Sequence, residues 1–152
     1  MILQEVSANT ARILPALDRV DAKGWIGKGA SETYLAQLES SKQQARAVAD
    51  EAKALARNPE KLSTSLALFF RLESLETMLG SVQEGTRKYE GAQAAQGLAK
   101  LYAEGGVNRE RFREYIVNLA AERETQFAVM DREAQRCRGT LMAPKQTTGK
   151  KK

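Results

Sequence analysis

The chain contains no histidine among its 152 residues. Helical bundles that bind a di-iron centre use Glu-x-x-His motifs, and helical haem proteins commonly hold the iron through an axial histidine. Serine and cysteine nucleophiles that rely on a histidine base need the same side chain. The absence of histidine therefore excludes these kinds of site and leaves carboxylate, lysine or tyrosine chemistry.

Cysteine occurs only once, as Cys137. A single thiol forms neither an internal disulfide nor a metal site built from several cysteines. Its position at the inward edge of a predicted helix favours a small apolar core residue over a reactive thiol. We therefore expect no metal and no cofactor.

Long apolar runs are missing as well. No stretch approaches the roughly 20 apolar residues that a membrane-spanning helix needs. The first residues, MILQEVSANTAR, show no basic segment followed by an apolar one, which is the pattern of a secretory leader. The cytoplasm is then the default expectation, but a mature exported chain with an added Met1 would show the same pattern, so the compartment stays open.

Proline is scarce, with three residues in the chain, and so are runs of β-branched residues. Both features favour helix over strand. The strongest pattern lies in 62–82, where apolar residues recur at alternating steps of four and three along one face of a helix. A second stripe covers another face in the first half of the same helix, so we expect neighbours on most sides of it. The first stripe is Leu68, Leu72, Leu75, Leu79 and Val82, and the second is Leu62, Leu66, Phe69 and Phe70.

The other apolar patterns also have a helical period and predict the elements around this central helix. A helix over 2–20 is kinked or divided at Pro15. Glycines make 21–30 a loop, and Ser31 is a suitable N-cap for the helix that follows. Pro59 is expected at the first position of the central helix. The remaining predicted helices are 31–57, 59–89, a short one over 92–104 that ends at Gly105 and Gly106, and 108–138.

The glycine-rich loop 21–30 contains Lys28 next to a glycine, and Ser31 follows the loop. A phosphate-binding loop needs a different glycine spacing and a preceding strand, and both are missing here. We therefore interpret Trp25 as a plug at one end of the bundle and the glycines as the turn.

These elements predict an all-α protein, an antiparallel bundle of four long helices plus one short helix. The bundle is expected to form one domain over 1–139. The remaining 140–152 lacks any apolar period and is expected to be a disordered basic tail. The inward positions of the last helix are predicted to be Phe112, Ile116, Leu119, Arg123, Phe127, Met130, Ala134 and Cys137.

Two charged residues fall within otherwise apolar stripes. On a helical wheel Glu73 lies within the second stripe of the central helix, with Glu76 nearby, and Arg123 interrupts the stripe of the last helix. We predict that Glu73 and Arg123 form a buried pair, either as a polar layer that sets helix register or as the lining of a cleft for an anionic ligand. We favour the polar layer, because no other catalytic group accompanies the pair.

The formal charge is +5, and much of the basic excess lies at the C-terminal end. Contact with a polyanion such as nucleic acid is predicted for Lys145, Lys150, Lys151 and Lys152, because clustered lysines attract phosphates without reading sequence. Arg109, Arg111 and Arg113 open the last helix and alternate with glutamates. This alternation is typical of a salt-bridged, solvent-exposed face and not of a nucleic-acid interface, because no aromatic residues interleave to stack on bases.

Three hypotheses about function follow from the sequence. The leading one is a non-enzymatic helical bundle that binds another protein or associates with itself. The second is a weak nucleic-acid or polyanion binder that acts through the basic C-terminal end. The third is a carboxylate-based enzyme or small-ligand carrier centred on Glu73.

Overall fold

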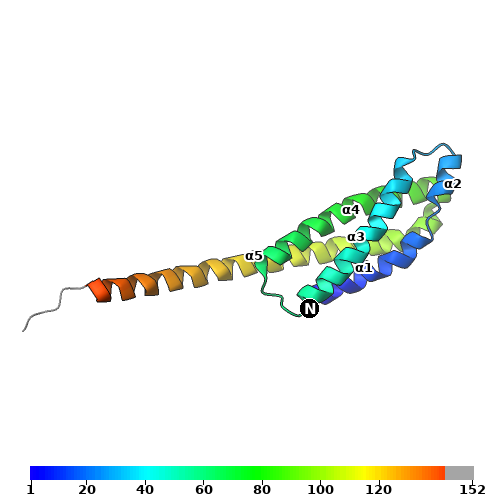
Figure 1. Ribbon diagram of the computed structural model, residues 1–152. Coiled ribbons are helices and arrows are strands. Elements are labelled where there is room, and N and C mark those ends of the chain that lie inside the picture. The colour runs from blue at the N-terminus through cyan, green and yellow to red at the C-terminus, as the bar shows by residue number, and fades with distance from the viewer. Residues whose placement is uncertain (143–152) are drawn as a thin grey trace, which may run out of the picture. The chain divides into compact units, whose positions relative to one another are not determined.

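The computed structural model describes residues 1–142, and it is all-α over that range (Figure 1). Four long helices and one short one pack against each other, which confirms the predicted fold class. The elements in chain order are α1 (Ile2–Asp18), α2 (Ala22–Gly27), α3 (Thr33–Leu55), α4 (Leu62–Glu90) and α5 (Ala92–Met142). The chain divides into two compact units, Met1–Val117 and Asn118–Lys152, and α5 contributes to both.

Helix α1 is continuous despite Pro15, so the predicted division at that residue is wrong. Proline removes one backbone donor. Only one turn of helix follows it, and the apolar face of α1 continues past it to Leu17, which is fully buried. The other large buried apolar side chains on this face are Ile2, Leu3, Val6 and Ile13.

The predicted loop 21–30 contains the short helix α2. Asp21 caps it by accepting a hydrogen bond from the backbone N–H of Gly24 at 3.1 Å. Gly29, at φ +94°, then makes the turn that leads to α3. The cap at Asp21 and the turn at Gly29 thus bound a helix of six residues, which is too short to show an amphipathic period in the sequence.

Trp25 on α2 is buried and fills one end of the bundle. Its ring stacks on Tyr89 at a centroid distance of 5.7 Å, and Tyr34 meets the ring edge-on at 5.4 Å. The indole N–H donates to Glu90 at 2.9 Å. Gly85 on α4 lies directly under the ring.

Helices α3 and α4 form a hairpin. Ser31 Oγ accepts a hydrogen bond from the backbone N–H of Thr33, the first residue of α3. Helix α4 begins at Leu62, so the prediction that Pro59 occupies its first position is wrong. Pro59 lies instead in the connection between the two helices.

The first stripe of α4 is buried along its whole length, as its spacing predicts. The second stripe is covered only in part, because Leu66 and Phe70 are exposed and Phe69 is half-buried. Helix α4 therefore has one complete buried face, and the expectation of neighbours on most sides of it is wrong. The buried face consists of Leu68, Leu72, Leu75, Leu79 and Val82.

Helix α5 joins the two helices that the sequence separates at Gly105 and Gly106. A side chain added at Gly105 would come within 3.2 Å of Asn9 Oδ1, and one at Gly106 within 3.4 Å of a Glu76 carboxylate oxygen. Gly105 thus lets α5 approach α1 closely, whereas the space at Gly106 is that of an ordinary contact, and each glycine costs about 1 kcal/mol in a helix relative to alanine. The helix continues to Met142, and the rest of the predicted tail lies outside the described residues.

Candidate functional site

A polar cluster lies in the first unit, where α1, α4 and α5 meet. Nη1 of Arg109 is 2.9 Å from Oε2 of Glu76, and their side chains are 29% and 17% exposed. The two side chains form an ion pair and not a hydrogen bond, because Glu76 Oε2 has no hydrogen-bond partner among the described residues. Arg109 Nε has no such partner among them either. The central helix therefore does carry a half-buried charge, and its partner is Arg109.

Burial raises the pKa of the Glu76 carboxyl, while Arg109 opposes the rise and the neighbouring Glu73 and Glu110 add to it. A raised pKa means that the folded protein favours the protonated acid more than the unfolded chain does. The pair is thus a half-buried polar contact at the edge of the core, in which burial of Glu76 outweighs the attraction of Arg109.

A cavity of about 20 Å³ adjoins Glu76. A space of this size holds about one water molecule, whereas small-molecule sites commonly span roughly 300–1,000 Å³. Asn9 on α1, beside the cavity, donates to the carbonyl of Leu101 at 3.2 Å and to Glu104 at 3.4 Å. The cluster therefore positions three helices and offers no room for a substrate.

A larger groove, of about 520 Å³, lies between α3 and α4. The charged residues in its lining are Glu51, Lys61 and Arg71. Two of them contact each other, with Arg71 Nε 3.3 Å from Glu51 Oε2. Within residues 1–142, no three histidine, cysteine, aspartate or glutamate side chains gather in a way that would hold a metal ion. Ser63 and Thr64 also line the groove, and Glu51, the one carboxylate in its lining, is held in the contact with Arg71.

The predicted site residues occupy different positions from those expected. Glu73 and Arg123 are both exposed, so the prediction that they lie in the interior is wrong. Arg123 donates to Gln126 at 3.1 Å along its own helix. The pairing of Glu73 with Arg123 stays a prediction.

Lys28, from the glycine-rich segment, donates a hydrogen bond to the backbone carbonyl of Tyr89, so its contact in the structure is with the protein's own backbone.

The predicted polyanion contacts are not part of the described chain. Lys145, Lys150, Lys151 and Lys152 all fall outside residues 1–142. The nucleic-acid hypothesis therefore stays a prediction from sequence.

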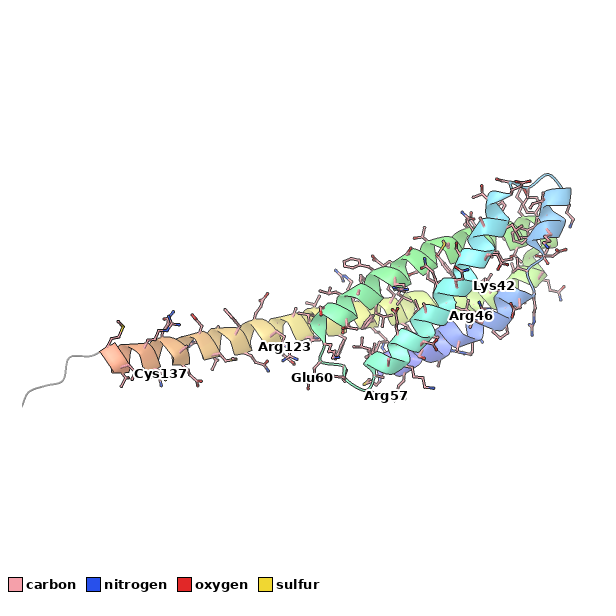
Figure 2. The ribbon with its side chains drawn as sticks, viewed as in Figure 1. Lys42, Arg46, Arg57, Glu60, Arg123 and Cys137 are labelled. Atoms are coloured by element: carbon pink, nitrogen blue, oxygen red, sulfur yellow. The ribbon has the colours of Figure 1, made fainter. Side chains whose placement is uncertain are left out.

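The inward stripe of α5 divides into a buried part and an exposed part. Phe112, Ile116 and Leu119 are buried, as predicted. From Ala121 to Met142 every side chain is exposed, so the prediction that the stripe is inward all along the helix is wrong. Phe127 is 72% exposed and Met130 66%. Cys137, on the same helix, is exposed as well (Figure 2).

The exposed stripe is the least expected surface of the molecule. At 100° per residue it lies in line with the buried part of the same helix. We call it the α5 seam, and it belongs wholly to the second unit. The α5 seam consists of Phe127, Met130, Ala134, Cys137 and Leu141.

Comparison of the chain with protein-family models, with curated proteins and with solved structures found no match. Over the described part of the chain, every helix is too short or too polar to cross a membrane. The residues and their arrangement therefore carry the argument about function.

Proposed function

We propose that this protein is a non-enzymatic interaction protein that binds another protein chain through the α5 seam. The observation that carries the proposal is the exposure of a continuous apolar row, which includes Phe127, Met130 and Leu141. Single exposed apolar residues are ordinary on a protein surface. A row at helical spacing is different, because it presents one apolar face to any helix that lies alongside.

The spacing of the seam indicates the kind of surface that covers it. From Phe127 to Leu141 the steps alternate between three and four residues. This is the spacing of the contact positions in coiled coils, where side chains of one helix insert between those of another. We infer that the partner contributes an amphipathic helix to the seam.

The same helix offers a matched pair of variants for a test. Ala134 belongs to the seam, and Ala128 projects about 120° away from it, given 100° per residue in a helix. Both alanines are exposed. Ala134→Glu and Ala128→Glu add the same side chain and charge to the same helix, and neither touches the core of the bundle.

The test is the size of the native complex in an extract of the cells that make the protein, measured by gel filtration with antibody detection. We expect the wild type and Ala128→Glu to elute together, at a mass above the chain mass of 16.8 kDa. Ala134→Glu is expected to elute later than both. If the two variants elute at the same position, the seam is not the binding surface.

A further inference from the structure

We infer that the helix covering the α5 seam is the same helix of a second copy, lying parallel and in register. The inference rests on the proposed function, because it identifies the partner of that surface. Its first support is the charge of the helix outside the seam. Between residues 118 and 142 the basic side chains are Arg123, Arg132, Arg136 and Arg138, and the acidic ones are Glu122, Glu124, Asp131 and Glu133.

Equal numbers of opposite charges let two copies of this helix lie side by side without net repulsion. A strongly acidic or basic partner would gain no attraction from such a surface. The balance therefore favours a second copy over a partner of high charge.

The second support is the position of two flanking charges. In a parallel coiled coil, the residue just before one contact layer faces the residue five positions later on the other helix. Glu133 precedes the Ala134 layer, and Arg138 follows the Cys137 layer. Glu133 of each copy therefore faces Arg138 of the other, and symmetry forms this contact twice.

In an antiparallel arrangement, fewer residues of the α5 seam lie opposite seam residues of the second copy. In one register that keeps most layers, Asp131 faces Asp131 of the second copy and Glu133 faces Glu133, so like charges meet. In the other, Asp131 faces Arg138 of the second copy, and Phe127 has no seam residue opposite it. Only the parallel register places every seam residue opposite its own counterpart.

The parallel register has a measurable consequence for thiols. It places Cys137 of both copies in one layer. Position 123 also falls in one layer, where Arg123 of each copy of the wild type lies opposite Arg123 of the other, and a cysteine introduced there would face its counterpart. In either antiparallel register the two residues at position 123 would be at least about 27 Å apart along the helix axis, given a rise of 1.5 Å per residue. A disulfide between two such cysteines therefore reports the orientation.

The experiment uses the purified full chain. Sedimentation equilibrium over a range of concentrations is expected to show the mass rising toward twice the chain mass of 16.8 kDa. Ala134→Glu should raise the dissociation constant at least tenfold, and Ala128→Glu should change it less than twofold. Circular dichroism of both variants checks that the helices are retained.

Orientation is then tested with diamide as the oxidant. Two proteins are oxidised: the wild type, and the variant Arg123→Cys with Cys137→Ala. Each should form a disulfide-linked dimer faster than the same protein does when Ala134→Glu is added to it. A dimer that links through Cys137 but not through position 123 would overturn the parallel register. A wild type that stays monomeric at every concentration would overturn the second copy as partner. If the complex in cell extract still depended on Ala134, the proposed function would stand without this inference.

Discussion

The packing of Trp25 against α4 leads to a prediction about Gly85. A Cβ added at this position would lie 2.6 Å from Cζ3 of Trp25 and 2.9 Å from Cε1 of Tyr34. The indole has little freedom to move away, because it is buried, stacked on Tyr89 and hydrogen-bonded to Glu90. Gly85→Ala is therefore expected to force a shift in the end of the bundle that Trp25 fills.

The magnitude follows from two opposing effects. Overpacking a rigid core site costs up to about 3 kcal/mol, and alanine in place of glycine returns about 1 kcal/mol of helix propensity. We expect Gly85→Ala to lower the free energy of unfolding by about 2 kcal/mol, or the melting temperature by about 4–8 °C. The control is Gly97→Ala on α5, where an added Cβ meets nothing within 4 Å.

The control should stabilise the protein by about 0.5–1 kcal/mol, since only the propensity term remains. Urea denaturation followed by circular dichroism measures both variants. If Gly85→Ala is as stable as Gly97→Ala, then α2 does not pack on α4 as described.

Two further predictions concern the core and the polar cluster. Leu72→Ala should cost about 2–5 kcal/mol in denaturation experiments, the usual range for a buried leucine, and a smaller effect is expected for Leu66→Ala, because Leu66 is exposed. The pKa of Glu76 is raised in the folded state, so its charged form weakens folding as the pH rises through that pKa. The wild type should therefore gain stability relative to Glu76→Gln when the pH falls from 7 toward 4.5, and a constant difference across that range would contradict the raised pKa.

Much of the fold was accessible from the sequence because the core of the bundle is periodic. The stripe of α4 repeats without interruption, and all of its members are buried. The sequence did not predict that the helices over 92–104 and 108–138 join into the single helix α5. Local propensity favours a stop at Gly105 and Gly106, and the close approach of Gly105 to Asn9 is visible only in the structure.

The polar site was predicted only in part. A helical wheel placed both Glu73 and Glu76 near the second stripe, and the burial of one of them depends on which residues of α5 lie alongside. Arg109 was interpreted as part of a solvent-exposed row of alternating charges. Its spacing of three residues from the buried Phe112 was the available signal that it lies on the inward side of the helix.

The exposed seam illustrates a different limit. An amphipathic stripe has the same sequence pattern whether its own chain or another chain covers it. Phe112 and Phe127 both belong to one stripe, and only the structure distinguishes the buried residue from the exposed one. Sequence therefore predicts that the face of α5 is covered, and the structure shows which part has no cover among the described residues.

The most direct test of the central claim is a photo-crosslink from the seam in the cells that make the protein. The photoreactive residue p-benzoylphenylalanine replaces Phe127 in one strain and Ala128, on the other side of the helix, in a second. We predict that irradiation links position 127 to a protein chain, a second copy or another protein, at least several times more efficiently than position 128. Equal yields from the two positions would contradict the claim that the α5 seam is a binding surface.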